Sequence, residues 1–440
     1  MPDWDALQAA LAGDLLRPGT PGYEAARAPA IANFADARPG AVVRCRAEAD
    51  VAAALAFAAD AGLPVAPRSG GHDFAGRSTT TGLVLDLAPL DRVEYADGVA
   101  TIGAGARLGA VYDALEPDGV TLPAGCGPEV GIAGLTLGGG FGVLGRRHGL
   151  LADALVGARA TLADGRVVDC DATTEPDLFW ALRGAGGARV AVVTSLTFRT
   201  VPAPEMTSFH LVWPFAQAAE ILLAWQTWSP DGPDELAASL LVVAPPDPAD
   251  PPRVHLFGTM LAPAAATRAV LGAIAGDAEW RFCDTLPFRA TKRRLAAHGP
   301  GDDRPGTHLH SRSEYLRAPL SAAAVTALAD HLAQDRVPGE SRELDLSPWG
   351  GAYSRVPADA TAFAHRDARA LLKHTAVTPP GGRSGWQDRS WAIARAAGTG
   401  GVYPNFPEPG LDPWSAEHLG GNLARLRAVK RRLDPSGLLG

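Results

Sequence analysis

The chain has 440 residues, 47% of them hydrophobic, and a formal net charge of -8. This length predicts two or three domains with a large core, and the acidic balance argues against nucleic-acid binding. No apolar run approaches the roughly 20 residues of a membrane span, and the N-terminus lacks a signal-peptide pattern, so we expect a cytoplasmic protein.

The spacing of the cysteines and histidines bears on whether the chain has disulfide bonds or a metal site. The four cysteines, Cys45, Cys126, Cys170 and Cys283, lack the paired spacing of a disulfide scaffold or a zinc knuckle. His308 and His310 form the only close histidine pair in the sequence, and no third histidine lies at helical spacing from them. We therefore predict no metal site.

The first predicted module is a strand-helix-strand unit that ends in a glycine turn. Residues 5–16 and 48–61 have helical periodicity, and residues 42–45 predict a short strand. Residues 67–78 then form a turn between two apolar runs. Gly70 and Gly71 permit a concave nest of backbone amides that can bind an anion, and phosphate is the natural guest. An ordinary loop is the alternative, because no Walker or Gly-x-Gly-x-x-Gly dinucleotide motif is present.

Three side chains of this turn would support a phosphate. Arg68 supplies a forked cation, while Ser69 and Ser78 supply hydroxyl donors. His72 stands at the tip of the turn, where it would lie beside the bound group.

A second glycine-rich segment follows at residues 122–142. Its glycines alternate with apolar residues such as Val130, Ile132, Leu135 and Leu137, which a flexible linker would lack. We interpret it as an ordered wall for a flat ligand, with a flexible loop as the alternative.

The rest of the chain predicts an α+β fold. Strands are expected at 156–162 and 190–198, a helix at 177–182, and a domain boundary near 201–204. Beyond it, strands at 209–213, 239–244, 254–260, 344–346, 371–377 and 401–403 alternate with helices at 216–228, 264–275 and 321–333. This rhythm predicts an antiparallel sheet with helices on one face. Residues 416–433 predict one closing helix.

Several motifs together resemble FAD-linked oxidases of the berberine bridge enzyme type, within the vanillyl-alcohol oxidase superfamily. They are Arg-Ser-Gly-Gly-His at 68–72, the glycine-rich run at 130–142, Asp-Leu-Phe-Trp-Ala-Leu-Arg-Gly at 177–184, Tyr-Pro-Asn-Phe at 403–406 and Val-Lys-Arg-Arg-Leu-Asp-Pro at 429–435. The resemblance implies a split PCMH-type FAD-binding domain, residues 1–204 and 391–440, with a substrate-binding domain inserted at 205–390.

The resemblance also implies FAD bound covalently through His72. The cofactor-binding residues expected from the two glycine segments, Val193 and the C-terminal motif are Arg68, Ser69, Gly70, Gly71, His72, Asp73, Ser78, Gly127, Val130, Gly131, Gly134, Leu135, Gly138, Gly139, Gly142, Val193 and Asn405.

The chain departs from the family pattern at three places. Many relatives carry a second flavin link from a cysteine at the position of Gly127, whereas Cys126 lies one residue earlier. We therefore expect a single link, with a shifted loop that brings Cys126 to the flavin as the alternative. Residues 187–191 read Gly-Ala-Arg-Val-Ala where relatives usually have Gly-Gly-Asn-Phe-Gly, a departure that would alter the cofactor wall. His418 and Leu419 stand where relatives often have two tyrosines.

The implied activity is an oxidase that takes hydride from an alcohol, sugar or heterocycle, in secondary metabolism, and reduces dioxygen to hydrogen peroxide. A base should face the flavin. The resemblance to carbohydrate-oxidising members makes Tyr403 the first candidate, with simple packing on the ring as the alternative, and Lys373 the second. Tyr353 can also reach the cavity.

The alternative function is a flavoprotein cyclase or isomerase, or a member without oxidase turnover. We expect a monomer or homodimer whose partners are a small substrate and dioxygen.

Overall fold

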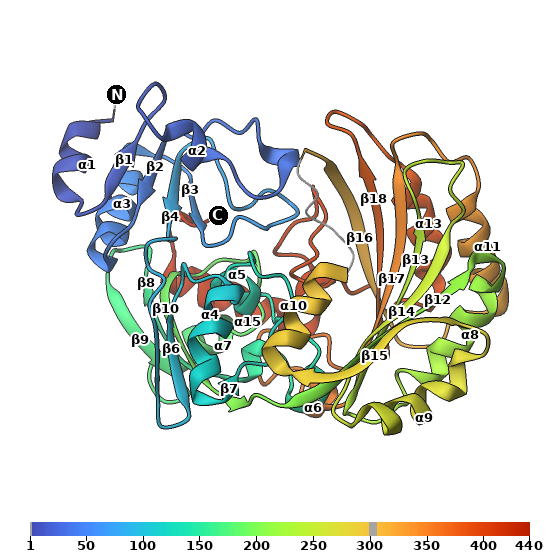
Figure 1. The fold of residues 1–440 in the computed structure, drawn as a ribbon. Helices are drawn as coiled ribbons and strands as arrows, with labels where there is room; N and C mark the ends of the chain where they lie inside the picture. Colours follow the sequence, from blue (N-terminus) through green and yellow to red (C-terminus); the bar gives the residue numbers. More distant parts are fainter. Residues whose placement is uncertain (1, 299–305) are drawn as a thin grey trace.

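The computed structural model describes residues 2–298 and 306–440, which form two halves side by side (Figure 1). The first half begins with a small sheet in the order β1-β2-β4-β3. Strands β2 (Ala41–Arg44), β3 (Val65–Arg68) and β4 (Leu83–Asp86) are parallel, with α3 (Glu48–Ala61) between β2 and β3. All four residues of β4 are buried, as expected of a central parallel strand. The glycine turn connects β3 to β4.

A five-stranded antiparallel sheet completes the first half, in the order β5-β6-β10-β8-β9. Its strands are β5 (Val93–Ala96), β6 (Val99–Gly103), β8 (Leu155–Thr161), β9 (Val167–Asp171) and β10 (Val192–Arg199). The second glycine segment carries α5 (Ile132–Leu137), and α6 (Gly145–His148) follows it. The C-terminal helix α15 (Leu423–Leu433) returns to this half, where Leu426 and Val429 join the main core (Figure 1).

The second half is a seven-stranded antiparallel sheet in the order β15-β12-β14-β13-β17-β18-β16. Its strands are β12 (Glu205–Pro214), β13 (Leu236–Ala244), β14 (Arg253–Met260), β15 (Glu279–Pro287), β16 (His308–Leu316), β17 (Ser341–Pro348) and β18 (Ala370–Thr378). Figure 1 shows α8 (Ala218–Trp228), α9 (Ala264–Ala275), α11 (Ala322–Ala333) and α13 (Trp386–Ala394) on its outer face. The inner face turns toward the first half, and α10 (Phe288–His298) lies between them (Figure 1).

The mixed α+β class and the helix-covered antiparallel sheet agree with the sequence prediction, but several elements differ. The helix predicted at 5–16 ends at Ala10, and residues 14–16 form β1 (Asp14–Leu16). Residues 401–403 form no strand. The predicted helix 416–433 is broken after α14 (Ala416–Leu419), because Gly420 has a positive φ of 50°.

Sequence reasoning missed β15, α10 and β16. The two strands lie at the edges of the sheet, and α10 is strongly basic. Charged residues at such edge positions obscure the apolar alternation that identifies a strand. No group of three or more potential metal ligands, His308 and His310 included, occurs in the described part of the chain. None of the described helices is long and apolar enough to cross a membrane.

Candidate functional site

The two glycine segments touch each other. A Cβ atom added to Gly70 or to Gly131 would overlap backbone atoms of the other residue. The Arg107 guanidinium reinforces the contact by donating from Nη1 to the Gly70 carbonyl at 3.1 Å. The glycine turn and the second glycine segment, which are far apart in the sequence, therefore form one continuous wall.

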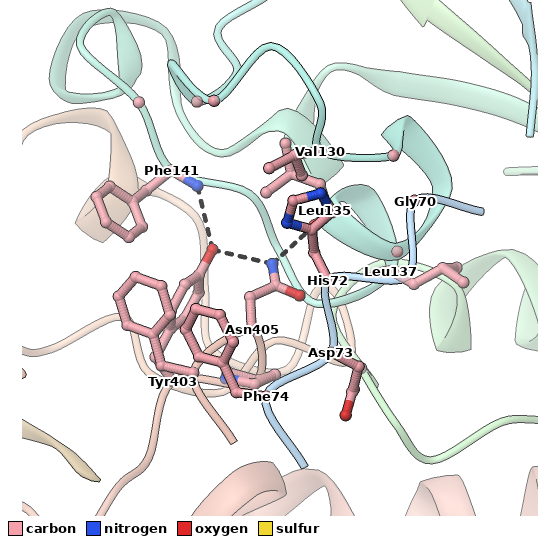
Figure 2. A pocket seen from close by; sticks show the side chains of 18 of the residues that line it. Gly70, His72, Asp73, Phe74, Val130, Leu135, Leu137, Phe141, Tyr403 and Asn405 are labelled. Atoms are coloured by element: carbon pink, nitrogen blue, oxygen red, sulfur yellow. Dashed lines mark hydrogen bonds between the residues drawn. The ribbon is translucent and has the colours of Figure 1, made fainter. Parts of the chain in front are cut away.

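A cavity of about 750 Å³ lies along this wall and reaches the inner face of the large sheet. Its volume is within the range of cofactor and small-molecule sites, roughly 300–1,000 Å³. Both catalytic candidates and most predicted cofactor-binding residues line it: Arg68, Ser69, Gly70, Gly71, His72, Asp73, Ser78, Gly127, Val130, Gly131, Gly134, Leu135, Gly142, Val193, Asn405, Lys373 and Tyr403. Figure 2 shows the His72 imidazole among these side chains.

Gly138 and Gly139 are the two predicted cofactor residues that do not line the cavity. An added Cβ on Gly138 would overlap the Asn405 amide, and one on Gly139 would meet the Phe363 ring at 2.9 Å. These two glycines therefore let the backbone pack closely against Asn405 and Phe363, and they do not line the ligand cavity.

The Arg68 guanidinium has partners other than a phosphate. It donates to the carbonyls of Ala26 and Arg27, and its Nη2 lies 3.9 Å from an Asp86 carboxylate oxygen. Only 6% of the residue is exposed. The predicted phosphate contact of this side chain stays a prediction, and the structure shows its charge already engaged in holding α2 (Tyr23–Arg27) against the turn.

Cys126 lines the cavity, but its thiol contacts a lysine of α10. The Lys292 ammonium lies 3.7 Å from Sγ and donates to the carbonyls of Ala124 and Gly125 at 2.7 and 2.8 Å. Lys292 is 1% exposed, and burial lowers its pKa. This contact directs the thiol toward α10, while Gly127 occupies the position after it in the wall.

Tyr403 has a phenolic oxygen surrounded by donors (Figure 2). It accepts hydrogen bonds from the backbone N–H groups of Gly140 and Phe141, at 3.0 and 3.2 Å, and from Asn405 Nδ2 at 3.1 Å. Burial nevertheless raises the pKa of Tyr403 to about 12, although these three hydrogen bonds act in the opposite direction. The lowered pKa that a tyrosine base needs is therefore not a property of this arrangement on its own.

Lys373 reaches the cavity from β18, the strand next to the sheet edge formed by β16. It stands opposite Asp345 on β17, with 3.9 Å between Nζ and a carboxylate oxygen, and opposite Ser313 on β16. Its Nζ also lies 4.7 Å from the centre of the Phe406 ring. Ser313 in turn accepts a hydrogen bond from the Tyr403 N–H. The sheet and the C-terminal motif thus meet at these residues.

Sequence reasoning missed most of the sheet side of the cavity. The residues concerned lie at alternate positions on their strands and share the inner face: Ala237, Ser239, Phe257, Asp345 and Ser347. Their period of two was the available signal. Arg77 and Arg189 also line the cavity, although neither was among the predicted cofactor-binding residues.

Comparisons with known proteins agree with this geometry. An FAD binding domain family model matches residues 39–171, and a berberine and berberine-like model matches residues 402–439. An uncharacterised FAD-linked oxidoreductase of Bacillus subtilis is 32% identical over 414 residues, 91% of this chain and 89% of its own. Glucooligosaccharide oxidase of Sarocladium strictum is 31% identical over 440 residues, covering 92% of this chain and 87% of its own.

Solved structures show the same fold. The Acremonium strictum glucooligosaccharide oxidase superposes with a TM-score of 0.88 at 25% identity, covering 100% of this chain and 98% of its own. Physcomitrella patens BBE-like 1 gives 0.87 at 26% identity, covering 99% and 97%. A further structure describes 6-S-cysteinyl, 8α-N1-histidyl FAD in the Acremonium enzyme.

The residues of this chain fit an FAD. Residues of both halves line the cavity, and an added Cβ on Gly134 would meet no atom within 4 Å, so the wall is open there to a flat ring. The buried Ser78 hydroxyl, which lines the cavity, has no hydrogen-bond partner among the described residues and can serve a ligand oxygen. The chain belongs to the berberine bridge enzyme-like family of FAD-linked oxidoreductases.

Proposed function

We propose that this FAD-linked oxidoreductase is an oxidase that removes a hydride from a carbon bearing a hydroxyl group in a small molecule, such as a sugar or another alcohol. The observation that carries the proposal is the shared cavity, which the flavin-binding segments and the polar inner face of the sheet line together. FAD supplies the hydride acceptor there and returns two electrons to dioxygen, which takes up two protons to give hydrogen peroxide. The related chitooligosaccharide, glucooligosaccharide and xylooligosaccharide oxidases support a hydroxylated substrate.

The sheet supplies the groups that would bind and orient this substrate. Ser239 and Ser347 lie 3.3 Å apart through their hydroxyl oxygens, and the Asp345–Lys373 pair lies next to Ser347 on the same face. Phe257 adds an apolar surface. A few polar groups on an apolar lining are typical of a site that fixes the orientation of a small ligand.

Tyr403 is our candidate for the group that contacts the reacting hydroxyl. Three donors already point at its oxygen, so its own O–H is directed elsewhere and can bond a substrate. As a base it would have to lose that proton first. The three donors stabilise the phenolate, while burial opposes it. Whether Tyr403 acts as a base therefore depends on the bound substrate, which would displace water from the phenol and share its proton.

The flavin link in this proposal is single and runs through His72. The support is that His72 lines the cavity at the end of the glycine turn, that Gly127 has no side chain, and that the Cys126 thiol contacts Lys292 instead. Protein precipitated with acid should stay yellow. The His72→Ala variant should lose the colour under the same treatment, whereas Cys126→Ala should keep it.

A substrate screen tests the proposed activity. Anaerobic protein is mixed with alcohols, sugars and cyclic amines, and the visible flavin absorbance is followed before and after air is admitted. We expect at least one hydroxylated compound to bleach the absorbance, and air to restore it with formation of hydrogen peroxide. Turnover of a compound without any bleaching would instead support the cyclase or isomerase alternative.

A further inference from the structure

Two arginines lie on the first-half wall of the cavity. Arg77 lies near the end of the glycine turn (residues 67–78), and Arg189 precedes β10. The two segments are in contact, because a Cβ added to Gly187 would lie 2.6 Å from Arg77 Nη1. Arg189 stands where the family resemblance places an asparagine, so this pair is a feature of the chain rather than of the motif.

Both guanidinium groups keep unused donors in a buried place. Arg77 Nη1, Arg189 Nε and Arg189 Nη1 are buried and have no hydrogen-bond partner among residues 2–298 and 306–440. The adjacent Ser78 Oγ is in the same state. Arg77 uses only Nη2, which donates to the Leu411 carbonyl at 2.9 Å. Burial lowers the pKa of both arginines, which shows how little solvent reaches them.

Unpaired buried cations are costly, so this wall is complete only when an anion occupies it. The nearby carboxylates do not take that place. Asp73 acts as a nearby charge on both guanidinium groups, and Asp412 acts on Arg77, but neither carboxylate forms a hydrogen bond or ion pair with these groups in the described part of the chain. Asp73 Oδ1 instead accepts from the backbone N–H groups of Ala75 and Arg77 within its own turn. An oxygen-rich anion that accepts several N–H bonds at once matches the free donors.

We propose that Arg77 and Arg189, together with Ser78, hold the diphosphate of FAD. This inference rests on FAD being the cofactor, and it does not depend on which substrate the enzyme oxidises. It also gives the cofactor a forked cation in place of Arg68, whose guanidinium is engaged by the carbonyls of α2. Planar guanidinium groups bind phosphate oxygens in pairs, which a lysine or an asparagine cannot do.

Binding measurements test this without turnover. In a His72→Ala background, from which flavin can be removed, the affinities for FAD and for riboflavin are measured by calorimetry with and without Arg189→Gln. A charge-assisted hydrogen bond lost from a buried site should weaken FAD binding roughly tenfold to a hundredfold. Riboflavin lacks phosphates, so its affinity should change by less than about threefold on the same reasoning. Arg77→Gln should behave similarly.

The matched control is Arg183→Gln, which removes a half-buried guanidinium from the same segment. Arg183 stacks on Phe179 and does not line the cavity, so neither flavin affinity should change. If Arg189→Gln does not fold, Arg189→Lys keeps the charge without the fork and should still weaken FAD more than riboflavin. Equal losses for the two flavins, or an unchanged affinity for FAD, would overturn the inference even if the oxidase activity is established.

Discussion

The contact between the two glycine segments can be tested by one methyl group. Gly131 has φ -73° and ψ 133°, values that alanine adopts freely, so Gly131→Ala brings no backbone strain. Its effect comes from space alone. The new Cβ would overlap the Ser69 hydroxyl and the Gly70 backbone nitrogen.

Neither neighbour can move without cost. The Ser69 hydroxyl donates to the Ala104 carbonyl at 2.6 Å, and Arg107 holds the Gly70 carbonyl at 3.1 Å. Overpacking of this kind typically costs about 1–3 kcal/mol of stability. Any movement that relieves this overlap also shifts the part of the glycine turn that carries His72. A misplacement of about 1 Å at a reacting group can cost about a hundredfold in rate, so flavin attachment should suffer more than folding.

Gly134→Ala is the matched control, because it makes the same substitution one turn further along, inside α5 (Ile132–Leu137). The added Cβ meets no atom within 4 Å. Alanine also favours a helix over glycine by about 1 kcal/mol. Its free energy of unfolding should therefore be unchanged or higher, although the methyl group enters the cofactor space.

The assay combines denaturant unfolding in the flavin-free His72→Ala background with visible absorbance per protein in the parent chain after acid precipitation. Gly131→Ala should lower both the free energy of unfolding and the flavin absorbance per protein. Gly134→Ala should leave the free energy of unfolding undiminished. If Gly131→Ala matches the parent chain in both, the two segments do not depend on each other, and the description of a shared wall is wrong.

Four further outcomes are expected. Tyr403→Phe should keep its flavin and lower kcat about a hundredfold, as loss of a proton-transfer group does; unchanged kcat would mean that the ring only packs. Lys373→Met should raise KM in steady-state assays, since it removes a cation that faces the substrate, and an unchanged KM would place the substrate elsewhere. Lys292→Met should lower the free energy of unfolding by about 1–3 kcal/mol, because two buried carbonyls lose their donor; equal denaturation midpoints would contradict this. Burial lowers the pKa of His374 to about 3, so below pH ~6.5 the unfolded chain takes up a proton that the folded chain does not, and stability falls progressively down to about pH 3. About 2 kcal/mol of this loss should occur between pH ~6.5 and pH ~5, and His374→Gln should abolish it in unfolding experiments at those two pH values.

The cofactor side of the site was predictable because glycine motifs depend on backbone shape. A turn such as Gly70-Gly71 or a wall such as 130–142 needs residues without side chains at fixed places, and that need is visible in the sequence. The register between the segments was not visible. Only the structure shows that Gly131 rests on Gly70, and that Gly138 packs against the Asn405 amide.

The substrate side was harder to predict because it is assembled from single residues on many strands. Asp345 and Lys373 are ordinary alternating positions until the strand order places them opposite each other. Arg68 shows that a recognisable motif does not determine which partners a side chain has. Its place in the motif favoured a phosphate contact, yet the carbonyls that engage its guanidinium come from a helix forty residues earlier, which no local pattern reveals.

The C-terminal motif explains why the two halves act as one site. Asn405 donates to the Leu135 carbonyl of the glycine wall at 2.9 Å, while the Tyr403 N–H and the Phe406 carbonyl both bond Ser313 on the sheet. This short segment therefore connects the cofactor wall to the strand beside Lys373. A displacement of the sheet moves the tyrosine whose oxygen is held by that wall. These residues act together with other contacts between the halves, such as those of Arg146 with the Trp349 and Gly232 carbonyls. A change at Tyr403 should therefore alter turnover while leaving the flavin in place.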